Sequence, residues 1–222
     1  MVTNESATQL PLTTRDESMT LGSLVPGLGM LCMISGVLGA ASAIVLLATP
    51  PMVSPDRYSY PLDATWYTVA QAFFGLQHLG ILCGIAGLVL LTWNQRSLLA
   101  RVGLITASVG LIGLTACELF AITAANASAL GPEATAVNNL YGTPMIIIGV
   151  GLVLGGIGVA RMPILSGWSR WITLVLGVYV FAVLFPAVFG PFVLGRLAIG
   201  IWMLLFGALG YTLWRGRRGS RG

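Results

Sequence analysis

The chain has 222 residues, of which 56% are hydrophobic and only 8% are charged. Soluble domains carry roughly 25% charged residues, and a soluble domain of this length has too little interior to hide so much apolar surface. The net charge of +4 comes from eleven arginines that lie mostly beside apolar stretches. This placement favours contact with anionic lipid headgroups and argues against a nucleic-acid partner.

Six apolar stretches predict six transmembrane helices. They occupy residues 24–48, 67–92, 98–122, 143–160, 171–189 and 194–214. An α-helix of about 20 residues crosses the hydrocarbon core of a bilayer, and every stretch falls within the spanning range. We therefore expect an all-α fold, a polytopic six-helix transmembrane bundle that forms one domain over residues 21–214.

The two ends of the chain are polar. Residues 1–20 are rich in Thr and Ser and are net acidic, so we expect a disordered segment rather than a cleaved signal peptide. Residues 215–222 are basic and are predicted to form a cytoplasmic tail.

Arginine placement predicts the orientation of the bundle. The turns 93–101 and 161–170 and the tail carry arginine without acidic residues, whereas the loops 49–66 and 123–142 carry Asp or Glu. Because excess arginine marks the cytoplasmic side, both termini are predicted to lie on the cytoplasmic side of a bacterial plasma membrane. Tryptophans at the span ends agree with these boundaries. The residues expected to determine topology are Arg96, Arg101, Arg161, Arg170, Arg215, Arg217 and Arg218.

Small residues recur one helical turn apart in three of the spans. The motifs are Gly80-x-x-x-Gly84, Gly103-x-x-x-Ala107 and Gly151-x-x-x-Gly155. Such stripes allow the backbones of two membrane helices to approach closely. They indicate either packing within the bundle or a seam between copies of a homo-oligomer. Pro144 is expected in the first turn of the fourth span, where its missing N–H costs nothing.

Several polar side chains fall inside the predicted spans. A polar group in hydrocarbon normally faces a partner or a water-filled cavity. At 1.5 Å per residue, the single histidine lies near the bilayer midplane and three other side chains lie toward the outer face. Together with Gln77 they form a candidate polar site between spans two, three and six, which consists of Gln71, Gln77, His78, Glu118 and Arg196.

Three interpretations of Glu118 and Arg196 stay open. The two side chains can form an ion pair or a hydrogen-bonded network that locks the bundle. Alternatively, they belong to a small-ligand or proton site open to the outside. In the third interpretation, either side chain extends to the outer headgroups.

For His78, we favour a neutral imidazole hydrogen-bonded to a neighbouring helix. A proton relay and a haem axial ligand opposite a methionine are the alternatives. Cys32, Cys83 and Cys117 are interpreted as small apolar residues. Neither a cofactor nor a metal is predicted.

Two outer loops are predicted to cover this site as a lid or as a surface for a partner. The first carries Asp56, Arg57 and Asp63 among prolines and tyrosines, which indicates a structured cap. The second carries Asn138, Asn139 and Tyr141.

Motifs typical of soluble enzymes, such as HExxH, GxSxG or a phosphate-binding loop, do not occur. We therefore expect a non-enzymatic membrane component that stabilises, regulates or recruits another membrane protein or a second copy of itself. The main alternative is a small-solute or proton-coupled carrier or channel that uses the candidate polar site. An intramembrane enzyme or redox protein ranks last.

Overall fold

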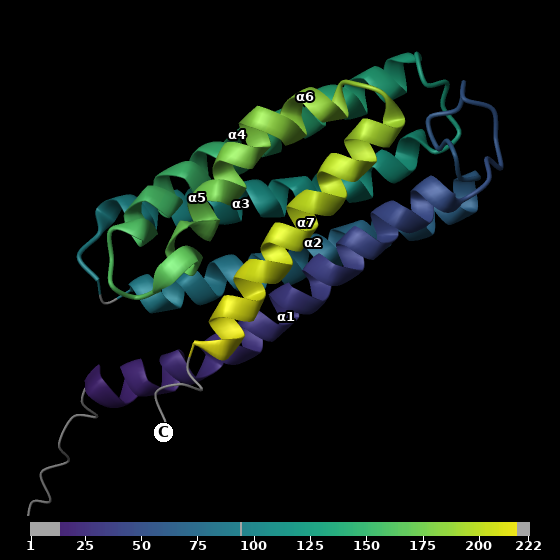
Figure 1. Ribbon diagram of the computed structural model, residues 1–222. Coiled ribbons are helices and arrows are strands. Elements are labelled where there is room, and N and C mark those ends of the chain that lie inside the picture. The colour runs from purple at the N-terminus through teal and green to yellow at the C-terminus, as the bar shows by residue number, and fades with distance from the viewer. Residues whose placement is uncertain (1–13, 94, 217–222) are drawn as a thin grey trace, which may run out of the picture.

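The structure is a computed structural model that describes residues 14–93 and 95–216 (Figure 1). Over these residues the fold is all-helical, with one isolated bridge between Arg57 and Ser128 in place of any strand. Six helical segments are long and apolar enough to cross a membrane. Their main elements are α1 (Thr14–Ala48), α2 (Ala64–Thr92), α3 (Leu98–Ala121), α4 (Pro132–Ala160), α5 (Ile172–Tyr179), α6 (Phe185–Val188) and α7 (Phe192–Arg215).

The fifth segment is composite. A 3₁₀ turn (Gly167–Trp171) leads into α5, a π-helical turn (Val180–Leu184) follows, and α6 completes the rod. A further 3₁₀ turn (Ile122–Ala124) extends α3. Such π-helical turns inside helices often lie at functional sites, and Val180 and Leu184 of this turn line the cavity described below.

Local signals set the helix starts. The Asp63 side chain accepts a hydrogen bond of 2.9 Å from the Trp66 amide at the start of α2, and Ser97 accepts one of 3.3 Å from the Ala100 amide at the start of α3. Both are N-caps, which satisfy amides that have no partner inside the helix. At α4, Pro132 occupies the first turn together with Glu133, a combination suited to the positive end of the helix dipole.

The six helical segments, which we call rods because the fifth is built from several elements, form a ring in which neighbours are antiparallel. Helix α1 packs against α2 and α7, α3 packs against α2 and α4, and α5 lies between α4 and α7. Figure 1 shows the yellow α7 lying along the purple α1, at the far end of the sequence. The ring is thereby closed by the first and last rods.

Small residues mark the closest helix contacts. A Cβ on Gly103 or Gly151 would collide with backbone atoms across the α3–α4 contact, and a Cβ on Gly80 or Gly84 would collide with Ser35 or Cys32 of α1. The predicted small-residue stripes therefore lie in contacts within the chain. Their use in a homo-oligomer stays a prediction.

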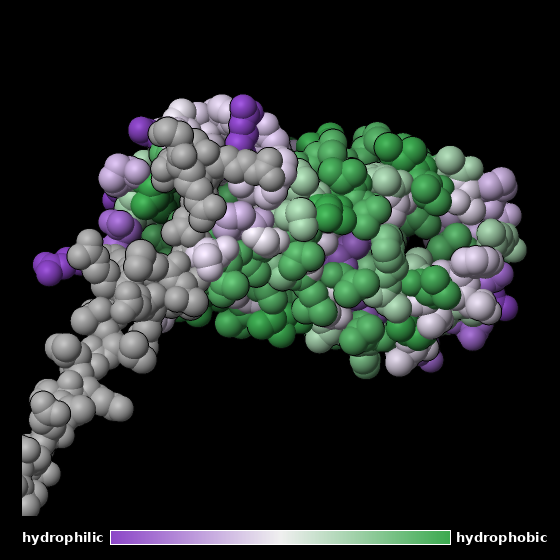
Figure 2. All heavy atoms as spheres, turned by 90° about the horizontal axis from the view of Figure 1, so that it is seen from below, coloured by the Kyte–Doolittle hydropathy of each residue, from purple (hydrophilic) through white to green (hydrophobic). Residues whose placement is uncertain are grey.

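The bundle has two distinct ends. We name the cap end after the loops 49–63 and 125–131, which are joined by the Arg57–Ser128 bridge. The opposite, arginine end carries the described arginines Arg96, Arg101, Arg161, Arg170 and Arg215. The face seen in Figure 2 is mostly apolar along its middle, and hydrophilic residues gather toward both ends.

Two predicted boundaries are wrong. Helix α1 begins at Thr14, so residues 14–20 are helical where disorder was expected. Helix α4 begins at Pro132, eleven residues before the predicted start, because its first three turns are too polar for a hydropathy pattern. Pro144 therefore lies inside α4. Residues 1–13 and the predicted topology determinants Arg217 and Arg218 lie outside the described residues.

Candidate functional site: a polar cavity at the cap end

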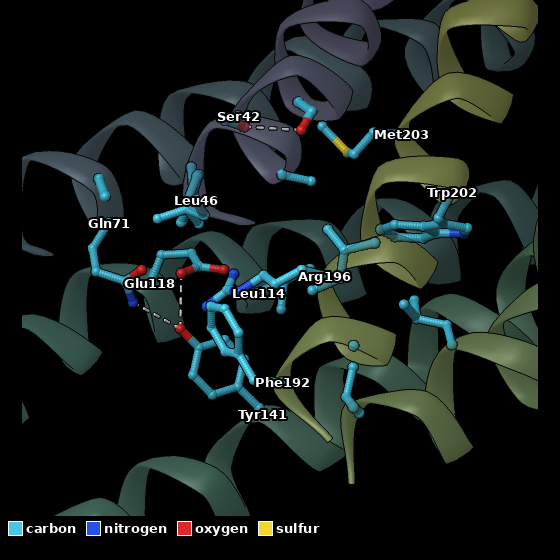
Figure 3. A pocket seen from close by; sticks show the side chains of 18 of the residues that line it. Ser42, Leu46, Gln71, Leu114, Glu118, Tyr141, Phe192, Arg196, Trp202 and Met203 are labelled. Carbon is cyan, nitrogen blue, oxygen red and sulfur yellow. Dashed lines mark hydrogen bonds between the residues drawn. The ribbon is translucent and has the colours of Figure 1, made fainter. Parts of the chain in front are cut away.

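A cavity of about 600 Å³ occupies the interior of the cap-end half of the bundle (Figure 3). All six rods and the first cap-end loop contribute to its lining. Four of the five residues of the candidate polar site are buried, and Arg196 is half-buried. All five line this one cavity: Gln71, Gln77, His78, Glu118 and Arg196.

Glu118 of α3 is the only acidic residue among the described residues of the lining, and it is 8% exposed. Its Oε2 atom accepts a hydrogen bond of 2.8 Å from the hydroxyl of Tyr141 on α4. That hydroxyl in turn accepts a hydrogen bond of 3.2 Å from Nε2 of Gln71 on α2. The chain of bonds, drawn as dashed lines in Figure 3, fixes the carboxyl group across three helices.

His78 approaches the other oxygen of the same carboxyl group. Its Nδ1 atom lies 3.8 Å from Oε1 of Glu118, beyond hydrogen-bond length. This nitrogen is buried and has no hydrogen-bond partner among the described residues. The hydrogen bond to a neighbouring helix that we predicted for the imidazole is therefore not formed at Nδ1.

Arg196 of α7 provides the only Arg or Lys side chain that the described part of the chain contributes to the lining. Its guanidinium carbon lies 5.2 Å from the centre of the Phe192 ring, a cation–π contact. The guanidinium interacts electrostatically with Glu118, toward which it extends in Figure 3. No ion pair or hydrogen bond within the described part of the chain holds it. The first interpretation was an ion pair or a hydrogen-bonded network. The direct Glu118–Arg196 ion pair is not made, whereas Glu118 does belong to a hydrogen-bonded network with Tyr141 and Gln71.

A second polar group lies deeper, on the α1 side. Nε2 of Gln77 donates a hydrogen bond of 3.4 Å to Oγ of Ser42, and the Ser42 hydroxyl donates one of 2.8 Å to the carbonyl oxygen of Gly39. This relay satisfies polar groups that would otherwise be costly at such depth. It also adds a hydroxyl and an amide to the cavity wall.

The cap contacts the cavity through few of its predicted residues. The Tyr58 hydroxyl donates a hydrogen bond of 3.0 Å to Oδ1 of Asn138, and both residues line the cavity. Burial raises the pKa of Tyr58 to about 12, so its phenol stays protonated and can donate at neutral pH. Asn138 and Tyr141 project from α4, not from a loop as predicted.

The other predicted cap residues do not line the cavity. Nη1 of Arg57 donates a hydrogen bond of 2.7 Å to the carbonyl oxygen of Asn126, which ties the two cap-end loops together. Asp63 caps α2. Asp56 accepts a backbone hydrogen bond from Ala129, and Asn139 is exposed on α4. The contacts of Arg57, Asp63 and Asp56 therefore hold the cap-end loops and the start of α2 in place.

Sequence reasoning missed several lining residues, among them Ser42, Tyr58, Tyr67, Phe192 and Trp202. Serine and tyrosine near a span end are so common in membrane proteins that no signal separated these from their neighbours. Trp202 did carry a signal that could have identified it, because it is the only tryptophan that the sequence places in the middle of a span.

The cysteines and other ligating residues form no cluster in the described chain. Cys32 and Cys117 are buried, as expected for small apolar residues, whereas Cys83 is half-buried. No group of three or more His, Cys, Asp or Glu residues comes together among the residues described.

No family model matches the chain, and no curated protein and no solved structure shows significant similarity to it.

Proposed function

We propose that the chain is an integral protein of a cell membrane whose six rods span the bilayer. The cap end faces the outside, and the arginine end and both termini face the cytoplasm. The apolar middle (Figure 2) and the five described arginines at one end support this arrangement, because positive loops stay cytoplasmic. Exposed Trp93, Trp168 and Trp171 lie at the same end, at the level where indole rings meet headgroups.

Within this frame, the cavity is the binding site of a small-solute carrier, entered from outside. The observation that carries the proposal is that Glu118 and Arg196 line one 600 Å³ cavity without forming an ion pair. Arg196 has no hydrogen-bonded partner among the described residues, and a charged group left unpaired inside a membrane span is costly. An ion pair that locks the bundle would bring the two groups together, whereas a solute site keeps them apart and available to a ligand. Recruitment of a partner protein stays a prediction without a comparable feature to support it.

Access of water from outside tests the proposal. In a background with Cys32, Cys83 and Cys117 replaced by alanine, single cysteines are introduced at cavity positions by Gln71→Cys and Ile199→Cys. A membrane-impermeant, positively charged thiol reagent is then added to intact cells. Both cavity cysteines should react, because water reaches their thiols and allows them to ionise.

Two matched positions make the result interpretable. Leu76→Cys lies on α2 at a side chain that is 64% exposed; in a bilayer it faces lipid and should not react. Ser54→Cys lies in the exposed cap-end loop and should react at once. Reaction at Ser54→Cys with none at either cavity position would show a sealed interior and would refute the carrier.

A further inference from the structure

We propose that the solute is a small zwitterion that carries one amine, one carboxylate and an apolar side chain, the chemical class of the α-amino acids. This inference rests on the proposed solute site and specifies what enters it. Among the described residues that line the cavity, Glu118 and Arg196 are the only ones of the types Asp, Glu, Lys and Arg. Their charges balance, so the cavity suits a solute that has no net charge but carries one positive and one negative group, which we call its two poles.

Arg196 provides the site for the carboxylate. Its guanidinium makes no hydrogen bond to any described residue and lies over the Phe192 ring. A guanidinium presents a planar fork of N–H donors that matches the two oxygens of a carboxylate. With no protein acceptor in place, these donors are available to a solute.

Glu118 provides the site for the amine. Its Oε2 atom is held by the Tyr141 hydroxyl, whereas no hydrogen bond from a described residue to Oε1 is formed, and His78 Nδ1 lies 3.8 Å from it. A primary ammonium has three donors. It can use Oε1 of Glu118, and the unprotonated ring nitrogen of a neutral His78 offers a second acceptor.

An apolar wall adjoins the two charged groups. Leu114, Ile148, Val180, Leu184 and Trp202 come from four of the six rods and line the same cavity. Leu114 lies one helical turn from Glu118 on α3, and Ile199 lies three residues beyond Arg196 on α7. A solute held by both poles therefore places its side chain against apolar surface, which favours an apolar over a polar substituent.

The test compares three probes of similar shape on the purified full-length protein in lipid nanodiscs. L-Leucine carries both poles, 4-methylpentanoate lacks the amine, and isopentylamine lacks the carboxylate. Calorimetric titration should give a saturable isotherm for leucine and affinities at least tenfold weaker for both analogues. Glycine, which has both poles but no side chain, should also bind at least tenfold more weakly than leucine.

Variants assign each pole. In Glu118→Gln, leucine should lose its advantage over 4-methylpentanoate; in Arg196→Gln, leucine should lose its advantage over isopentylamine. Glu133→Gln and Arg161→Gln remove exposed charges outside the cavity and should leave the wild-type order of affinities unchanged. If either cavity variant fails to fold, the analogue series on the wild-type protein still decides.

Two results would overturn the zwitterion while the solute site stands: equal or tighter binding of an analogue, or no binding of any probe to a protein whose Gln71→Cys variant is labelled from outside. Failure of that labelling at both cavity positions would instead refute the site itself.

Discussion

The hydroxyl of Tyr141 donates a hydrogen bond of 2.8 Å to the carboxyl group of Glu118. The contact joins α3 to α4 inside a cavity and leaves the second carboxyl oxygen without a hydrogen bond from the described residues. Tyr141 also accepts a bond from Gln71, so one phenol positions the acid relative to three helices. A carboxyl group that is held through one oxygen while its other oxygen is available is suited to bind a ligand.

Tyr141→Phe should destabilise the protein by about 1–3 kcal/mol, because it leaves Gln71 and Glu118 each without a buried partner. The free energy of unfolding in mixed detergent micelles measures the effect. Tyr60→Phe is the matched control, since Tyr60 contacts Phe192 through its ring and its hydroxyl makes no hydrogen bond to a described residue. Equal losses in the two variants would contradict the assigned role of Tyr141.

Close approach of α3 and α4 depends on Gly151, where a Cβ would collide with the backbone of Ala107. Gly151→Ala should therefore lower the unfolding free energy by about 1–3 kcal/mol, the usual cost of overpacking. On the same helix, a Cβ at Gly142 would meet nothing within 4 Å, and Gly142→Ala should raise helix stability by up to about 1 kcal/mol. If both substitutions had the same sign, the proposed α3–α4 contact would be wrong.

The hydrogen bond from Tyr58 to Asn138 should be insensitive to pH across the physiological range. The pKa of Tyr58 is raised to about 12 in the folded chain, from about 10 in an unfolded one. Its contribution to stability is thus complete below pH 10 and is lost as the pH rises from 10 toward 12. Thermal unfolding from pH 7 to 11 should show a steeper decline above pH 10 for the wild type than for Tyr58→Phe. Parallel curves would contradict this assignment.

Much of the fold follows from the sequence because hydrocarbon length is a strict constraint. Apolar runs near 20 residues located all six rods. The fourth rod shows where that signal stops: residues 132–142 are helical but polar, and hydropathy reports lipid contact, not helicity. Pro132 followed by Glu133 was the available start signal.

The five polar residues of the candidate site were predictable from the sequence, whereas the rest of the cavity lining and the geometry of the site were not. Polar side chains inside apolar spans are costly and therefore easy to find in the sequence, and the five residues selected in this way do line one cavity. The rotation of each helix about its axis depends on close packing at residues such as Gly103 and Gly151, which sequence patterns do not resolve. For that reason the pairing of Glu118 with Tyr141, and not with Arg196, emerged only from the structure.

The proposed solute site requires the cap end to face the outside of the cell and the arginine end to face the cytoplasm. Reporter fusions test this most directly, with alkaline phosphatase or green fluorescent protein joined after Arg96 at the arginine end or after Leu130 in the second cap-end loop. We expect fluorescence without phosphatase activity at Arg96 and phosphatase activity without fluorescence at Leu130. The same signal at both positions, or the reverse pattern, would contradict an outward-facing cavity.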